Sequence, residues 1–260
     1  MVLKFVICGI EHSGTTLLSD IFRQVPELDS GFEVGVLLGE SPKQFSDIQP
    51  FYKNMLGGWQ IEKEDLRIIC DTNSFLEFYQ GLKNKSRVLK PSVKNIFDKT
   101  PRYFSSIFKC YEKMQVPFIA TYKDPRSLVF SDFKRTGKGK DFNTWYETYK
   151  KPKLGYLKNI YVNNYLPWKM GLQNNEFSSI LCISLEEICL NTRQTMNLIF
   201  YHTGIEFKIE YLLLKNLRYA HTIKPEISSR IPFEYINAFT KYQQEIIEND
   251  FSVLKDWFYR

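Results

Sequence analysis

Residues 9–16 form the glycine-bounded stretch that most restricts the fold of this chain. The stretch reads Gly-Ile-Glu-His-Ser-Gly-Thr-Thr, follows the apolar run 6–8 and precedes a segment with the apolar spacing of a helix. A strand, a tight loop and a helix in this order place backbone N–H groups and the helix N-terminus around an anion. Thr15 stands after Gly14, where a nucleoside-triphosphatase loop carries lysine. The sequence therefore predicts a phosphate site that lacks ordinary ATP chemistry.

A second strand-to-helix turn lies at residues 117–135. Its apolar first part is typical of a strand, and the tetrapeptide Lys-Asp-Pro-Arg at 123–126 precedes an amphipathic helix. The proline of that turn suits the first turn of a helix, so Lys123, Arg126 and Ser131 are expected around the helix start. Two cations, a hydroxyl and helix N–H groups can converge there on an anion. The sequence thus predicts two phosphate sites.

Together the two motifs resemble those of the sulfotransferases that use 3′-phosphoadenosine 5′-phosphosulfate (PAPS). Members of that family pair a loop of the type Arg/Lys-Ser-Gly-Thr-Thr with a later Arg-Asp-Pro-Arg segment and a following serine. Here residues 12–16 stand for the 5′-phosphosulfate loop, and residues 123–126 with residue 131 stand for the 3′-phosphate site. The resemblance implies that PAPS, and its product PAP, are bound by His12, Ser13, Gly14, Thr15, Thr16, Lys123, Arg126 and Ser131.

Three shorter segments extend the resemblance. Residues 98–103, Asp-Lys-Thr-Pro-Arg-Tyr, are similar to a stretch common in bacterial and Golgi-type relatives. Residues 31–33, Gly-Phe-Glu, are similar to the Gly-x-Glu segment that supplies the catalytic carboxylate of tyrosylprotein sulfotransferases. Residues 183–188 resemble the strand and helix start that close the family core, with Ser184 where Tyr or Arg is common. The resemblance is closest over residues 1–135 and thin after residue 190.

The resemblance also implies catalytic roles. Glu33 is expected to be the general base, and Lys99, oriented by Asp98, to stabilise the bridging oxygen as charge develops. Arg230 corresponds to a basic residue that closes over the 3′-phosphate in several relatives. His12 departs from the pattern, because relatives carry Arg or Lys there. As imidazolium it donates to the sulfonate, as neutral imidazole it serves as the base, and otherwise it caps the helix; the sequence leaves these roles open.

The order of strand-like and helical segments predicts an α/β fold: a parallel sheet with helices on both faces, P-loop-containing and sulfotransferase-like. Ligands of such sheets lie at the carboxyl ends of the strands. Residues 136–178 are expected to form a helical insertion, and residues 207–260 a helical C-terminal region with an exposed loop at 222–232. Residues 1–260 are expected to form a single domain. The predicted strands are 3–9, 67–71, 94–98, 118–123 and 179–184.

Composition excludes several classes of protein. A net charge of +6 without a nucleic-acid-binding motif predicts no nucleic-acid partner. No apolar run approaches the ~18 residues of a transmembrane helix, so no transmembrane segment is expected. The five cysteines are widely spaced, which predicts reduced core thiols and, by default, a cytoplasmic location. His, Cys and carboxylate residues show no metal-ligand spacing, so the predicted transfer is metal-independent.

The acceptor is left open by the sequence: a small molecule, a carbohydrate, a lipid or a peptide with a hydroxyl or amine. Trp59 either lines an acceptor pocket or packs beneath a loop. His202 and His221 have no companion residues and are expected to be structural. Two other functions remain as alternatives. A nucleotide-dependent kinase is disfavoured by Thr15, and a catalytically silent nucleotide-binding protein is favoured by the departures at His12 and Lys123.

Overall fold

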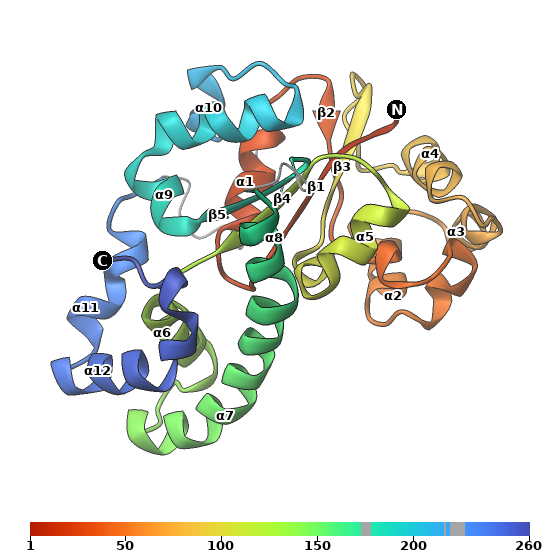
Figure 1. Ribbon diagram of the computed structural model, residues 1–260. Helices are drawn as coiled ribbons and strands as arrows, with labels where there is room; N and C mark the ends of the chain where they lie inside the picture. The colour runs from red at the N-terminus through yellow and green to blue at the C-terminus, as the bar shows by residue number, and fades with distance from the viewer. Residues whose placement is uncertain (173–177, 216, 219–226) are drawn as a thin grey trace.

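A five-stranded sheet, parallel throughout, lies at the centre of the molecule in the order β2-β3-β1-β4-β5 (Figure 1). The computed structural model describes residues 1–172, 178–215, 217–218 and 227–260. The predicted α/β fold with a parallel sheet is confirmed. The strands are β1 Leu3–Gly9, β2 Leu28–Asp29, β3 Asn95–Lys99, β4 Phe118–Tyr122 and β5 Ile180–Ser184.

One predicted strand is wrong. Residues 67–71 belong mostly to the helix α3, Lys63–Cys70, whereas the other four predicted strands are found within one residue at each end. In α3 the buried residues are Leu66, Ile69 and Cys70, and Ile68 between them is exposed. This three-and-four spacing is helical, so the adjacent isoleucines do not mark a strand. The sequence analysis also missed β2, whose two residues are too few to show a strand period.

Both faces of the sheet are buried, as expected for parallel strands. Along β1, Phe5 and Ile7 point to one hydrophobic core, while Val6 and Cys8 point to the other. The Phe5 face is covered by α1 Thr15–Phe22, α9 Leu185–Leu190, α10 Thr192–Thr203 and the 3₁₀ turn η6 Ile209–Leu213. The Val6 core takes in α2 Phe51–Gly58, α3, α4 Phe75–Lys85, α5 Ile107–Lys113, α6 Pro125–Thr136 and α7 Phe142–Ile160.

The predicted helical insertion and helical C-terminal region are confirmed over the described residues. The insertion consists of α7, the π-helical turn η4 Tyr161–Tyr165 and α8 Leu166–Gly171. The C-terminal region contains η7 Ile231–Phe233, α11 Glu234–Ala238, α12 Lys241–Asp250 and η8 Ser252–Trp257. Of the predicted loop at 222–232, residues 222–226 lie outside the described residues, and residues 227–232 lead into η7. Whether residues 1–260 form a single domain stays a prediction.

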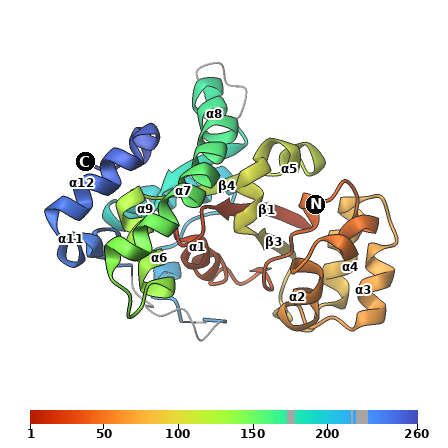
Figure 2. The same cartoon turned by 90° about the horizontal axis from the view of Figure 1, so that it is seen from below.

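Two groups of helices lie on opposite sides of the molecule, one of consecutive helices and one that joins α6 to the C-terminal helices. In Figure 2, α6, α11 and α12 lie together at one end and α2, α3 and α4 at the other. Three 3₁₀ segments lie between β2 and β4 in the sequence: η1 Val36–Leu38, η2 Pro42–Asp47 and η3 Pro101–Ser106. The α6 end is the one relevant to the predicted donor site, because α6 begins directly after β4.

The five cysteines are free thiols and all are buried, which confirms the predicted core thiols. Within the described chain, the helices are too short or too polar to cross a bilayer.

Candidate functional site

The loop after β1 is held in a tight, strained conformation against the end of β4. Gly9 and Gly14 have φ values of +152° and +95°, in the region that favours glycine. A Cβ atom at residue 9 would collide with Thr121 of β4. Ser13 Oγ lies 3.0 Å from the Thr121 carbonyl oxygen and 2.6 Å from Thr121 Oγ1. The Ser13 hydroxyl therefore ties the loop to β4, while the Ser13 N–H donates to the Ile10 carbonyl oxygen at 3.1 Å.

The N-terminus of α1 faces this loop. Gly14 is its N-cap residue, and no side chain of the described chain caps the helix there. The helix α6 differs, because its N-cap Asp124 accepts the Arg126 N–H at 2.8 Å. The first-turn N–H groups of α1, with the hydroxyls of the buried Thr15 and half-buried Thr16, thus remain open to an anion.

The second predicted phosphate site is built around a buried lysine at the end of β4. Lys123 Nζ donates to Ser131 Oγ at 2.7 Å, so the structure brings these two predicted residues together. Among the described residues, no carboxylate oxygen lies within ion-pairing distance of Lys123 Nζ. Burial is the main reason that the pKa of Lys123 is lowered to about 8. Strands β1 and β4 are neighbours, so this lysine and the loop occupy adjoining strand ends.

Arg126 has other partners than Ser131 and Lys123. Its guanidinium donates to Asp124 Oδ2 at 2.6 Å and to the carbonyl of Tyr259 at 3.0 Å, and it lies 3.4 Å from Glu248 Oε2. The group also packs 5.1 Å from the Tyr235 ring centroid. These contacts anchor the C-terminal region to the start of α6. The predicted phosphate contact of Arg126 stays a prediction.

The two residues expected to act on the sulfuryl group lie together, although 66 positions separate them in the sequence. Lys99 Nζ donates to Glu33 Oε1 at 2.8 Å and lies 5.1 Å from the Phe32 ring centroid. The Lys99 side chain is only 4% exposed, whereas that of Glu33 is 24% exposed. Lys99 pairs in register with Ile7 of β1, so its backbone lies next to the strand end from which the predicted phosphate loop, residues 9–16, begins.

The hydrogen bonds of Asp98 support the Glu33 loop, which is the segment 30–35 between β2 and η1. Asp98 accepts hydrogen bonds from Tyr79 at 2.7 Å, Tyr103 at 2.8 Å and Thr100 at 2.7 Å. Thr100 Oγ1 in turn accepts the N–H of Val34 at 3.0 Å, directly after Glu33. Burial raises the pKa of Asp98 to about 6. The predicted orienting role of Asp98 is thus replaced by a bond chain that fixes the loop carrying Glu33.

Two arginines that the sequence analysis missed hold the other side of that loop. Arg23 of the α1 C-cap donates to the Ser30 carbonyl at 3.3 Å and to the Gly31 carbonyl at 2.9 Å. Arg218 also donates to the Ser30 carbonyl and pairs with Asp29 at 2.7 Å. Contacts to backbone carbonyls depend on the fold and have no sequence pattern, so they could not be predicted.

His12 lies in the loop with a left-handed backbone, φ +67°. Its Nε2 atom is 3.6 Å from Asp132 Oδ1 on α6. Burial, followed by the charge of Arg135, lowers the pKa of His12 to about 4, although Asp132 opposes the shift. The imidazole is therefore neutral near pH 7, which disfavours the imidazolium role among the three left open by the sequence.

The remaining candidates are placed as follows. Arg230 is exposed at the start of η7. Trp59 is fully buried, donates to the Phe32 carbonyl at 2.7 Å and packs against Gly31, so it supports the Glu33 loop and lines no acceptor pocket. His202 Nε2 lies 3.1 Å from the Phe118 carbonyl oxygen, a structural contact as expected. His221 lies outside the described residues.

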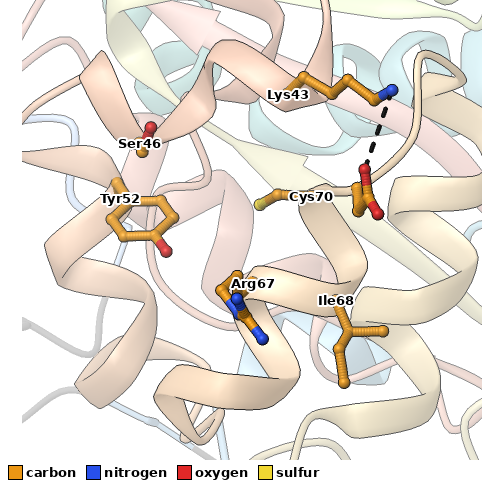
Figure 3. A pocket seen from close by; sticks show the side chains of 7 residues that line it. Lys43, Ser46, Tyr52, Arg67, Ile68 and Cys70 are labelled. Atoms are coloured by element: carbon orange, nitrogen blue, oxygen red, sulfur yellow. Dashed lines mark ion pairs between the residues drawn. The ribbon is translucent and has the colours of Figure 1, made fainter.

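A depression of about 350 Å³ lies elsewhere, over η2, α2 and α3 (Figure 3). Lys43 and Asp71 form an ion pair of 3.8 Å across it. Burial raises the pKa of its Cys70 thiol to about 12, so the sulfur is a poor nucleophile. The depression has no residue in common with the loop, Lys123 or Lys99 and takes no part in the candidate site.

Comparison with solved structures identifies the architecture. The sulfotransferase domain of the Synechococcus PCC 7002 olefin synthase has a TM-score of 0.63 at 15% identity, covering 95% of this chain and 93% of that one. The sulfotransferase domain of the curacin biosynthetic pathway has a TM-score of 0.59 at 15% identity, covering 97% and 98%.

The chain has the sulfotransferase fold.

A third match agrees with the two domains. Mouse sulfotransferase SULT7A1, solved in complex with PAP, has a TM-score of 0.51 at 14% identity and covers 95% of this chain and 82% of that one. No family model matches the sequence, and no curated protein matches it. The phosphate loop, Lys123 and the pair of Lys99 and Glu33 all lie at the carboxyl edge of the sulfotransferase-type sheet.

Proposed function

We propose that this protein transfers a sulfuryl group from PAPS to a hydroxyl or amine of an acceptor. The proposal depends above all on Lys123, a buried lysine whose ammonium donates to Ser131 at 2.7 Å and has no carboxylate partner among the described residues. A buried cation is costly unless it is paired, so a site of this kind suits an anionic ligand. An uncapped helix start on the neighbouring strand end supplies the second anion site.

Two anion sites on adjoining strand ends match a nucleotide that carries phosphate groups at both the 3′ and 5′ positions. In the proposed site, the 5′-phosphate is bound by backbone N–H groups of the loop and by Thr15 and Thr16. The 3′-phosphate is bound by Lys123 and Ser131, and Arg230 is the further candidate for it. This pair of sites would distinguish PAPS from ATP, which has no 3′-phosphate.

The chemical step assigns one task to each member of the Lys99–Glu33 pair. The acceptor oxygen or nitrogen attacks sulfur in line, the bond between sulfur and the bridging phosphate oxygen breaks, and PAP leaves. Glu33 takes the proton from the acceptor, and Lys99 donates to the bridging oxygen as negative charge develops there. The 2.8 Å contact between their side chains supports this division, since one fixed pair can serve both oxygens.

Donor binding gives the first test. PAP without Mg²⁺ is expected to raise the melting temperature of the protein, because a ligand that binds only the folded state stabilises it. ATP with Mg²⁺ is the control and is expected to have a much smaller effect. Stabilisation by ATP–Mg²⁺ alone would favour the kinase alternative. Binding of PAPS without transfer in a screen of alcohols, phenols, sugars, peptides and amines would favour the silent protein.

Lys123 gives a test by pH. Because burial lowers the pKa of Lys123 to about 8, its ammonium loses a proton as the pH rises through 8. The affinity for PAP is therefore expected to be full below pH 8 and to fall above it, whereas an ordinary lysine would hold it to about pH 10. Lys123→Arg should remove this fall, since arginine stays protonated. Titration calorimetry from pH 6.5 to 9.5 measures it, and an identical decline in both proteins would contradict the role of Lys123.

A further inference from the structure

Lys153, from the helical insertion, reaches the phosphate loop through Asp132. Lys153 Nζ on α7 lies 2.8 Å from Asp132 Oδ2 on α6, and Asp132 Oδ1 lies 3.6 Å from His12 Nε2. The Lys153 and Asp132 side chains are 14% and 12% exposed. A cation from a helix that follows both sequence motifs is thus held beside residue 12, where PAPS-dependent relatives carry Arg or Lys.

Other contacts between α6 and α7 fix this arrangement. Tyr149 lies one turn before Lys153, on the same face of α7, and its hydroxyl donates to Asp132 Oδ2 at 2.7 Å. The Tyr149 ring stacks on Trp145 with centroids 4.3 Å apart, and Trp145 Nε1 donates to Thr136 Oγ1 at 3.0 Å. Asp132 therefore holds the Lys153 ammonium in place, and an ammonium with three N–H donors can also bind a further oxygen.

The charges that act on the His12 imidazole are mostly positive, although Glu11, its neighbour in the chain, is an exposed carboxylate. Three cations, Arg135, Lys123 and Lys153, act on the imidazole, and Asp132 is the carboxylate that opposes them. Of the other acids near Lys123, Asp124 is paired with Arg126, and burial raises the pKa of Glu186 to about 7. The neutral imidazole adds no charge of its own. The surplus of cations lies where the loop itself supplies none, which is the arrangement that an anionic ligand requires.

We propose that Lys153 is a donor-binding residue that contacts the 5′-phosphosulfate group of PAPS in place of the cation missing at residue 12, with Asp132 as its positioning residue. The inference rests on the proposed function. The helical insertion then has a role in donor binding, because α7 carries a residue that binds the donor beside the loop, in addition to packing on the sheet.

The test compares three nucleotides by calorimetry. Lys153→Gln is expected to weaken PAP and adenosine 5′-phosphate by about tenfold or more, the effect of a lost charge-assisted hydrogen bond, and to leave adenosine 3′-phosphate unchanged. Lys123→Gln is expected to give the reciprocal pattern, with losses for PAP and adenosine 3′-phosphate alone. Lys153→Arg should retain affinity within about threefold. Lys151→Gln, an exposed lysine on the same helix, is the matched control and should bind all three like the wild type.

The outcomes separate this inference from the proposed function. One outcome overturns the inference. If the wild-type protein binds PAP, and Lys153→Gln binds PAP and adenosine 5′-phosphate as tightly as the wild type does, Lys153 is only an interhelical ion-pair residue. A loss confined to adenosine 3′-phosphate and PAP overturns the inference too. If wild-type protein does not bind PAP, the proposed function fails as well. Should Lys153→Gln not fold, Lys153→Met, which keeps an unbranched apolar stem without the charge, replaces it in every arm.

Discussion

Glu33→Gln is expected to retain PAP binding and to lose about 10²- to 10⁴-fold in the rate of sulfuryl transfer, the usual contribution of a positioned general base. Glutamine keeps the size of the side chain, and its amide oxygen can still accept a hydrogen bond from Lys99 Nζ, which lies 2.8 Å from Glu33 Oε1. The variant therefore changes basicity with little change in packing. The measurements are turnover with labelled PAPS, on an acceptor found by screening, and the dissociation constant for PAP.

His12→Asn is the comparison variant for the base. It is expected to change donor affinity more than turnover. The pKa of His12 is about 4, so an acid limb in the pH profile of the wild type does not by itself identify the base. The base is identified by comparing the turnover of Glu33→Gln with that of His12→Asn. Normal turnover in Glu33→Gln, with turnover lost in His12→Asn, would make His12 the base and assign Glu33 to the positioning of Lys99.

Local sequence determined the parts of the site that could be predicted. The phosphate loop depends on Gly9 and Gly14, which adopt positive φ, and on the strand and helix that flank them. The pairing of Lys123 with Ser131 follows from their placement at a strand end and two turns into the next helix. Both features involve residues close in sequence, and both were expected from the order strand, turn, helix.

Contacts between distant segments explain what the sequence did not predict. Arg126 matched the family motif, but Asp124 two residues earlier and Glu248 of α12 bind its guanidinium. The ion pair of Lys153 with Asp132 depends on how α7 packs on α6. The strand expected at 67–71 failed for a different reason, because two adjacent isoleucines suit either period and only burial identifies the helix α3.

The Glu33 loop also combines a feature that the sequence predicted with supports that it did not predict. Its distance from the phosphate loop in the sequence resembles the family pattern, which pointed to the residue. Its position in space is set by Asp98 acting through Thr100 and by the Arg23 and Arg218 contacts to backbone carbonyls. Such supports are recognisable only once the chain is folded, because any residue supplies a carbonyl oxygen.

Lys99→Ala is expected to lower turnover by about 10²- to 10³-fold, the loss seen when one donor to a developing oxyanion is removed. PAP affinity should change much less, since the ammonium acts mainly on charge that appears in the transition state. The Lys99 side chain is nearly buried and pairs with the more exposed Glu33, so its removal leaves a carboxylate that water can reach. Single-turnover rates with labelled PAPS and calorimetry with PAP separate the two effects.

The double variant Glu33→Gln/Lys99→Ala tests whether the pair acts as a unit. Residues that serve one transition state are strongly non-additive, so the double variant is expected to lose little more than the worse single variant. Lys109→Ala, an exposed lysine on α5, is the control and should turn over like the wild type. Wild-type turnover in Lys99→Ala would remove Lys99 from the mechanism. Losses that multiply would mean that Glu33 and Lys99 act independently, despite the 2.8 Å between their charged atoms.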